Sequence, residues 1–176
     1  TKFDDHFLWD WGLALGILLS FLIYVVVYSL SSANHRAEEI ARKMTMDLGK
    51  YKLALDSASN HVVITDVEGR VIYANPTVEK LTGYSLSEVI GNTPRLWGRQ
   101  MDEEFYENFW KTIKIEKKVF IGTLKNKRKN GEVYDAQATV SPIIDERGQL
   151  AGFVGVEEDV TQENMVKRQI AESLSK

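Results

Sequence analysis

The feature that most constrains this chain is a run of residues without formal charge near its N-terminus. Between Asp10 and His35 there is no Asp, Glu, Lys or Arg, and residues 11–30 are mostly apolar. About 20 helical residues cross a bilayer, and helices of globular proteins seldom run this long without a polar face. The run is longer than the apolar part of a signal peptide, and no small-residue cleavage site is evident. We therefore predict a transmembrane helix over residues 11–33, with a buried core helix as the alternative.

The residues that flank this run predict its orientation. Residues 1–10 have one Lys against three Asp, whereas basic residues gather on the other side, at Arg36, Arg42, Lys43, Lys50 and Lys52. Aromatic residues lie near both ends, as interface anchors do: Trp9, Trp11, Tyr24 and Tyr28. Because the flank richer in Lys and Arg lies on the cytoplasmic side of a membrane, residues 1–10 are expected to be a short extracytoplasmic stub. The chain is then a single-pass protein of the inner (cytoplasmic) membrane, with everything after Ser31 in the cytoplasm.

Residues 34–57 form a charged segment with a regular apolar pattern. Its apolar positions are separated alternately by four and three residues: Ala37, Ala41, Met44, Leu48, Tyr51 and Leu55. Such a heptad seam needs a partner helix, and a second copy of the chain is the simplest one. We predict a juxtamembrane signalling helix in a parallel coiled coil, and hence a homodimer. The alternative is one amphipathic helix on the domain surface, since Gly49 weakens the helix.

From Ser59 the pattern changes to short strands, turns and helices. Strands are expected at residues 61–66, 71–74, 119–127, 132–144 and 149–159, and helices at 76–81, 86–90, 101–115 and 161–174. Asn130-Gly131 and Arg147-Gly148 mark the turns between the last three strands. This order predicts the α+β class, with a five-stranded antiparallel sheet that carries helices on one face.

Four segments of this part resemble the PAS sensory family. They are Ile64-Thr-Asp66 with Gly69; Tyr73-Ala-Asn-Pro76 with Leu81-Thr-Gly-Tyr84; Asn126-Lys-Arg-Lys-Asn-Gly131 with Tyr134; and Pro142-Ile143 with Gly148 and Asp159-Val-Thr161. Each alone is a weak signal, but their order and spacing resemble the family over residues 58–161. The resemblance implies the PAS fold, with a pocket between sheet and helices. It also implies that Asp159 holds the junction to an output helix over residues 162–176, and that Thr161 caps that helix.

Several PAS cofactors do not suit this sequence. The chain has no cysteine, and Pro94 of Gly91-Asn-Thr-Pro94-Arg95 lies about where a light-oxygen-voltage domain carries its reactive cysteine. A cysteinyl adduct to flavin is therefore excluded. Haem PAS domains take a His on or near the long helix, whereas the histidines here are His6, His35 and His61. His61 begins a strand and is expected to be a surface residue, so haem is not expected.

A non-covalent flavin remains a candidate. Trp110 and Asn126 resemble residues of the FAD-binding PAS domains found in aerotaxis receptors and nitrogen-fixation redox sensors. The resemblance implies that Trp110 packs near the isoalloxazine and that the amide of Asn126 bonds the ring edge. Arg95, next to Pro94, would offer a cation to the pyrophosphate. The alternatives are a core role for Trp110, and a pocket that is empty or holds another small ligand.

Enzyme and nucleic-acid functions find little support. The net charge is −3, and there is no Gly-rich phosphate loop, zinc-protease motif or nucleophile elbow. Glu157, Glu158 and Asp159 follow one another on a strand, so their side chains alternate between faces and do not converge on a metal. His35-Arg36 lies before the domain, where the phosphoacceptor helix of a histidine kinase is not expected. We predict a sensor fragment without catalytic residues.

The predicted function is a sensory and signal-relay module of a membrane-bound protein. A ligand in the pocket or a signal from the membrane would move the junction at residues 159–161. That movement would rotate the output helix in a dimer, with a seam at Met165, Val166, Ile170 and Leu174. The chain ends within a helical pattern, so an output domain is expected to follow, either a histidine kinase of a two-component system or a diguanylate cyclase. The alternative is a ligand-free PAS domain that acts as a dimerisation and relay spacer.

Overall fold

The computed structural model describes the backbone of residues 5–174 and the side chains of residues 13–174. Trp9 and Trp11, which we predicted to be interface anchors, lie outside the described side chains. The chain divides into two compact units, with the boundary between Tyr51 and Lys52. The described part of the first unit is helix α1 up to Tyr51, and the second unit holds the end of that helix, the sheet and the remaining helices.

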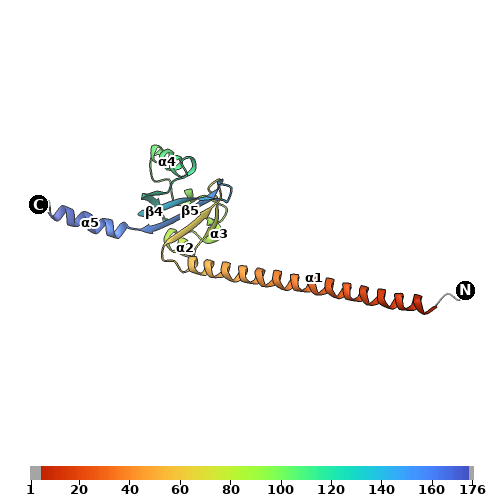
Figure 1. The fold of residues 1–176 in the computed structure, drawn as a ribbon. Coiled ribbons are helices and arrows are strands. Elements are labelled where there is room, and N and C mark those ends of the chain that lie inside the picture. The colour runs from red at the N-terminus through yellow and green to blue at the C-terminus, as the bar shows by residue number, and fades with distance from the viewer. Residues whose placement is uncertain (1–4, 175–176) are drawn as a thin grey trace. The chain divides into compact units, whose positions relative to one another are not determined.

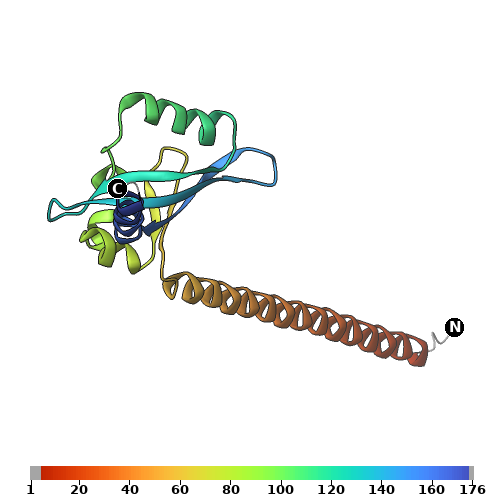
Figure 2. The same ribbon diagram turned by 90° about the vertical axis from the view of Figure 1, so that its left-hand side faces the viewer.

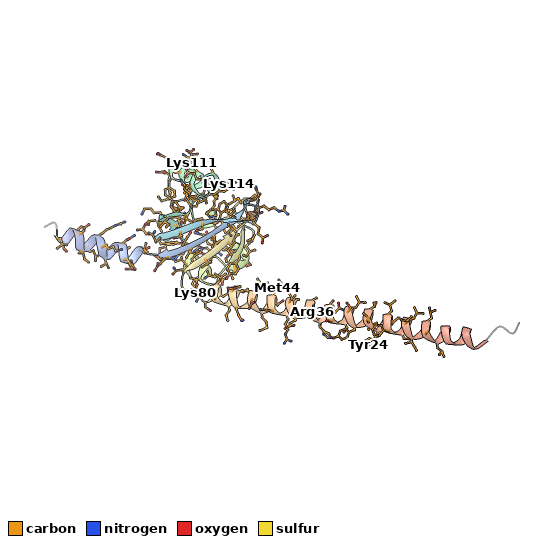
Figure 3. The ribbon with its side chains drawn as sticks, viewed as in Figure 1. Tyr24, Arg36, Met44, Lys80, Lys111 and Lys114 are labelled. Carbon is orange, nitrogen blue, oxygen red and sulfur yellow. The ribbon has the colours of Figure 1, made fainter. Side chains whose placement is uncertain are left out.

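Helix α1 (Asp5–Asp56) is one continuous helix of 52 residues. The predicted membrane segment and signalling segment therefore join without a break, and Gly49 is accommodated inside the helix. Its apolar part has no buried residue and is long and apolar enough to cross a membrane. The side chains of Tyr24, Arg36 and Met44 project away from the helix (Figure 3). The seam residues Met44 and Leu48 are exposed, so the coiled coil stays a prediction.

The five predicted strands are confirmed, with ends that shift by only a residue. They are β1 (His61–Thr65), β2 (Val71–Ala74), β3 (Phe120–Lys127), β4 (Val133–Ile144) and β5 (Leu150–Asp159). All neighbours pair antiparallel in the order β2-β1-β5-β4-β3, which puts the last strand at the centre. Figure 1 shows β4 and β5 side by side, with α5 (Thr161–Leu174) leaving the sheet after β5. The end of the central strand therefore leads directly into the output helix.

The segment between β2 and β3 carries the helices. They are α2 (Thr77–Thr82), α3 (Leu86–Val89), the 3-10 turn η1 (Pro94–Leu96), α4 (Glu103–Trp110) and the π-helical turn η2 (Lys111–Ile115). Ser85 and Glu88 form the predicted capping box at the start of α3, and Gly83 ends α2 in the left-handed conformation. The long helix predicted over residues 101–115 changes to a π-helical turn after Trp110. Figure 2 shows α4, in green, as a layer of its own beside the strands.

The turn η2 is amphipathic. Ile113 is buried, whereas Lys111 and Lys114 are exposed and point away from the domain (Figure 3). Single π-helical turns inside helices are frequent at functional sites, because they re-aim the side chains around them. Here the turn follows Trp110 directly, so the change of helical geometry falls where the predicted pocket lies.

A buried asparagine ties the end of α1 to the sheet. The side-chain oxygen of Asn75 accepts a hydrogen bond from the backbone N–H of Val62 at 2.9 Å. Its amide nitrogen donates to the backbone oxygens of Leu55, at 3.1 Å, and Asn60, at 2.9 Å. Asn75 is fully buried, so these three bonds satisfy a side chain that water does not reach. They fix the path of the chain from α1 into β1 and from β2 into α2.

The core lies between the sheet and the short helices. Its largest members are Val63, Val71, Val78, Val89 and Trp97, each of which is at most 4% exposed. Gly152 in β5 permits a close approach of that strand to the end of β1. A Cβ atom there would lie 2.1 Å from the backbone oxygen of Thr65, and the φ of Gly152 is +155°. No other residue type fits at that position without moving the strands.

Candidate ligand pocket and signal junction

A cavity of about 1190 Å³ lies between the sheet and the segment from η1 to η2. Its sheet side is formed by residues of β1, β3, β4 and β5, including Phe153, Gly155 and Glu157. These three β5 residues alternate along the strand, and alternate residues of a strand face the same side of the sheet. Binding pockets for small molecules usually measure about 300–1,000 Å³, so the cavity has room for a large ligand.

The structure brings the predicted cofactor residues Arg95, Trp110 and Asn126 to this one cavity. Asn126 is buried inside, with 2% exposure, whereas Arg95 is exposed at the rim. Trp110 is 36% exposed, which does not suit a fully buried core residue. Its ring meets that of Phe153 edge-on at 5.9 Å and lies over the β1–β2 turn, 3.5 Å from where a Cβ of Gly69 would be. Trp110 therefore reaches from the sheet to the turn along the side of the pocket.

The prediction that His61 is a surface residue is wrong. Its side chain is 1% exposed and lines the cavity. The inward face of β1 carries it because His61 pairs with Glu157 in the register between β1 and β5. The ring meets the buried Trp97 edge-on, with 5.2 Å between the ring centroids. The sequence argument against haem therefore loses its premise that His61 is a surface residue, although His61 lies on β1 and not on the long helix.

A polar cluster forms the inner end of the cavity. Asn126 donates a hydrogen bond from Nδ2 to Oε2 of Glu157 at 2.9 Å, and Nδ1 of His61 lies 3.6 Å from the same oxygen. The Glu157 side chain is only 11% exposed. Asn126 belongs to the edge strand β3 and Glu157 to the central strand β5, so their bond crosses over β4. The carboxyl thus accepts from Asn126 and has His61 as a near neighbour, in a site that is shielded from water.

Burial sets the protonation of this cluster. It raises the pKa of Glu157 from 4.5 to about 7, although donors on Trp97 and Asn126 lower that pKa in part. The same burial lowers the pKa of His61 from 6.5 to about 3, because a charged imidazole would lose its hydration. At neutral pH His61 is therefore uncharged, and Glu157 exists in both its neutral and its ionised form.

Two buried polar atoms of this cluster have no hydrogen-bond partner among the described residues. They are Nδ1 of His61 and the hydroxyl of Tyr134. Tyr134 is 1% exposed and lies opposite Asn126 in the register between β3 and β4. Buried polar atoms are nearly always paired, and an unpaired one costs about 1–3 kcal/mol. His61 lines the cavity, so its unpaired nitrogen is what a site that binds a polar ligand is expected to show.

The predicted signal residues Asp159 and Thr161 lie together at the end of β5. Asp159 accepts hydrogen bonds through Oδ1 from the backbone N–H of Thr161, at 3.0 Å, and from its hydroxyl, at 2.6 Å. Its other oxygen accepts from the guanidinium of Arg128, which also donates to the backbone oxygen of Leu81 in α2. Burial would raise the pKa of Asp159, but the bonds from Thr161 and Arg128 bring it below its usual value. The carboxylate therefore stays charged and holds the junction.

The role predicted for Thr161 as a cap of α5 differs from what the structure shows. The Thr161 hydroxyl accepts a hydrogen bond from the backbone N–H of Asp135 in β4, at 2.9 Å, instead of from its own helix. The Asp135 carboxylate in turn accepts from the side-chain amide of Asn164 in α5, at 3.2 Å. The sequence reasoning missed this because the partner lies 26 residues away, on a neighbouring strand. Thr161 and Asn164 thus hold the first turn of α5 against the sheet.

Residues that sequence reasoning did not single out complete the pocket and the junction. They are His61, Trp97, Arg128, Tyr134 and Glu157. The alternation along β5 was enough to place Glu157 on the same face as Phe153, so its position could have been found. No signal in the sequence marks Trp97, which is buried and whose backbone carbonyl accepts a hydrogen bond from the distant Lys127 N–H at 2.7 Å.

A sequence profile described as "PAS domain" matches residues 59–162, which is more than half of the chain. The chain belongs to the PAS domain family. The match begins just after α1 and ends within the first turn of α5, so it covers the sheet, the pocket and the signal junction. The fold and family that the sequence predicted are confirmed.

The similar proteins include several regulators. The chain is 29% identical over 126 residues to the nitrogen fixation regulatory protein of Klebsiella oxytoca. This alignment covers 70% of this chain and 25% of that protein. It is 37% identical over 125 residues to the blue-light photoreceptor of Listeria innocua, with coverage of 69% and 49%. The aerotaxis receptor of Escherichia coli is 28% identical over 102 residues, with coverage of 57% and 20%. The chain thus spans a quarter of the first relative's length and about half of the photoreceptor's.

Solved structures agree with this assignment. The PAS domain of a protein from Colwellia psychrerythraea superposes with a TM-score of 0.59 at 25% identity, covering 65% of this chain and 98% of that chain. A light-oxygen-voltage domain that was studied with a flavin analogue has a TM-score of 0.57 at 28% identity, with coverage of 70% and 93%. The domain is therefore a PAS sensory domain, related to nitrogen fixation regulators, an aerotaxis receptor and blue-light photoreceptors.

Proposed function

We propose that this chain is the sensory and relay part of a membrane-bound signalling protein, and that its pocket binds a flavin. The observation that carries the proposal is the cavity of about 1190 Å³, which joins an aromatic side at Trp110 to a polar end at Asn126 and Glu157. A planar heteroaromatic ligand needs a flat apolar contact and hydrogen-bonding groups at one edge. The unpartnered Nδ1 of His61 in the same cavity favours a ligand that is itself polar at that edge.

The residues fit a flavin in three places. The Asn126 amide offers a donor and an acceptor to the ring edge, and Trp110 flanks the ring plane. Arg95 lies at the rim, together with Arg99, and the guanidinium groups would meet the phosphates of the cofactor. A bound flavin supplies reversible electron transfer. The chain itself supplies orientation, exclusion of water and hydrogen bonds, and without cysteine it forms no thiol adduct.

Similar proteins support this ligand. One of the solved neighbours is a light-oxygen-voltage domain that was studied with a flavin analogue, and two of the curated relatives are Listeria blue-light photoreceptors. The aerotaxis receptor is a relative whose name denotes sensing, and the nitrogen fixation proteins are relatives named as regulators. Pro94 lines the cavity in this chain, so light sensing through a cysteine at that position is not part of the proposal.

The pocket would act on an output domain through α5. The inner end of the pocket and the junction lie on the same strand, with Glu157 two residues before Asp159. In the proposed protein, α1 crosses the inner membrane at residues 11–33 and pairs with a second copy over residues 34–57. The PAS domain then lies in the cytoplasm, and α5 passes its signal to a histidine kinase or a diguanylate cyclase.

The absorption spectrum of the full chain in detergent tests the ligand. We expect flavin absorption bands after purification or after incubation with FAD, and an elution profile in which these bands follow the protein. Asn126→Ala is expected to weaken FAD binding at least tenfold, since one good polar contact corresponds to ~1.4 kcal/mol or more. Asn130→Ala, in the exposed turn between β3 and β4, is the matched control. A chain that stays colourless with excess FAD contradicts the proposal.

The second function, a relay and dimerisation spacer without ligand, is favoured by the exposed apolar residues of the helices. Leu48 and Tyr51 on α1 are each 69% exposed, and Met165 and Ile170 on α5 are about half exposed. Such stripes are covered when two copies pair. Under this function Trp110→Ala leaves signalling by the intact protein unchanged, whereas Leu48→Asp abolishes it. Loss of signalling in Trp110→Ala, with dimers retained, separates the flavin function from the spacer.

A further inference from the structure

The Glu157 carboxyl is surrounded by more polar and ionisable groups than ligand binding requires. His61, Trp97, Asn126 and Tyr134 act directly on it or are acted on by it, and Arg128 and Asp159 lie beyond them, next to Tyr134. Asn126 donates a hydrogen bond to Glu157 at 2.9 Å, and the Trp97 side chain is a second donor beside it. The cluster is therefore densely polar but incompletely bonded.

The missing bonds indicate a second arrangement of the same side chains. The buried Tyr134 hydroxyl lies near the Asn126 amide but completes no hydrogen bond among the described residues, and Nδ1 of His61 stops at 3.6 Å from Glu157. An ionised carboxylate has about four acceptor positions, whereas a protonated carboxyl has fewer, because one of its oxygens carries the proton. Loss of the Glu157 proton therefore creates acceptors for which a buried, unpaired hydroxyl is a ready donor. Both protonation forms occur at neutral pH, because the pKa of Glu157 is about 7.

Tyr134 also connects this carboxyl to the signal junction. The guanidinium of Arg128 lies over the Tyr134 ring, 4.4 Å from its centroid. The same guanidinium donates to Asp159 at the end of β5. Burial raises the pKa of Tyr134 far above its usual value, and the nearby charges of Glu157, Arg128 and Asp159 all act on it as well. A shift of the Tyr134 ring would therefore move the Arg128 guanidinium, which holds Asp159.

We propose that Glu157 is a proton-binding switch at the inner end of the pocket, read out through Tyr134 and Arg128 at the Asp159–Thr161 junction. A ligand that donates a hydrogen bond or brings positive charge to Glu157 favours its ionised form, and the released proton passes through the pocket to solvent. A ligand that is anionic at this edge keeps the proton in place. The switch deepens the relay function proposed above, and it operates whether or not the ligand is a flavin.

Nuclear magnetic resonance of the isotope-labelled full chain in detergent tests the switch without any ligand. The backbone amide of Thr161 and the side-chain amide of Asn126 are followed while the pH is raised from about 5.5 to about 8.5, a range that brackets the pKa. In the wild type both signals are expected to titrate with one midpoint near 7. Glu157→Gln should abolish both titrations, and Glu158→Gln, on the exposed neighbour, should leave both unchanged.

Tyr134→Phe tests whether the Tyr134 hydroxyl connects Glu157 to the Asp159–Thr161 junction. It keeps the ring under Arg128 but removes the hydroxyl, so Asn126 should still titrate while the Thr161 shift falls several-fold. Signal dispersion like that of the wild type shows that each variant is folded. The proposal is overturned if Thr161 titrates in Glu157→Gln as it does in the wild type, or if it does not titrate in the wild type. Absence of FAD binding would overturn the ligand proposal alone, because no ligand is present in this titration.

Discussion

Replacement of Glu157 by Gln should make the domain more stable at high pH and leave its stability almost unchanged at low pH. The pKa of Glu157 rises from 4.5 in the unfolded chain to about 7 in the folded one. The folded state therefore holds a proton that the unfolded state releases between these values, and the contribution of Glu157 to stability falls as the pH rises through this window. At ~1.4 kcal/mol for each pH unit, the full loss above the window is ~3 kcal/mol. Gln keeps the oxygen that Asn126 bonds but cannot ionise.

Denaturation with urea, followed by near-ultraviolet circular dichroism of the full chain in detergent, measures the effect. The buried Trp97 and Tyr134 report on the packed domain, whereas the far-ultraviolet signal would be dominated by the 52-residue α1. We expect Glu157→Gln to gain ~3 kcal/mol at about pH 8.5, or about 10 °C in Tm, and less than ~1 kcal/mol at about pH 5. A gain that does not depend on pH, or a loss at high pH, would show that Glu157 is not buried as described.

His61 gives the opposite pH dependence and so provides an internal check. Its pKa falls from 6.5 to about 3, so the unfolded state binds the extra proton between these values and stability rises with pH there. In the wild type the two effects cancel between pH 4.5 and 6.5. Glu157→Gln leaves only the His61 effect, so its stability should rise with pH up to about 6.5. Glu158→Gln, in which the exposed neighbour changes, should follow the wild type within ~0.5 kcal/mol.

Three further variants test the fold, the dimer and the junction. Asn75→Ala removes three buried hydrogen bonds and should cost ~3 kcal/mol in the same urea assay; a loss below ~1 kcal/mol would contradict them. Tyr51→Asp on the α1 seam should convert cross-linked dimers to monomers, whereas Met46→Asp, also exposed but off the seam, should not. Equal effects of the two variants would exclude the heptad pairing. Thr161→Ala removes the hydrogen bonds to Asp135 and Asp159, so it should lower the free energy of unfolding by ~1–2 kcal/mol and speed amide exchange in the first turn of α5. Unchanged exchange would mean that packing alone holds that turn.

The elements of the domain followed from local sequence signals. Alternation of apolar residues located the strands, Ser85 and Glu88 located a helix start, and Gly83 and Gly131 marked positions with positive φ. These signals act within a few residues of each other, so they can be read from the sequence alone. The π-helical turn after Trp110 was not predicted, because nothing in Lys111–Ile115 departs from an ordinary helical pattern.

The pocket could be predicted only in part. Trp110, Asn126 and Arg95 were placed by resemblance, and they do line one cavity. His61 was misplaced because the burial of a strand residue depends on which strands become its neighbours. β1 pairs with β5, nearly a hundred residues later in the chain, and this pairing puts His61 opposite Glu157. Register across distant strands is a property of the whole sheet, and one sequence does not reveal it.

Hydrogen exchange of the junction tests the proposed relay from pocket to output helix. The full chain is loaded with FAD in detergent, and exchange at Thr161 and Asn164 is compared between the oxidised and the chemically reduced cofactor. Their backbone N–H groups bond to Asp159 and Val160, at 3.0 Å and 2.9 Å, so their protection reports how firmly α5 is held. We predict a change of about tenfold, which corresponds to ~1.4 kcal/mol, at these amides and none in α3. Identical exchange in both states would contradict a relay from the pocket to α5.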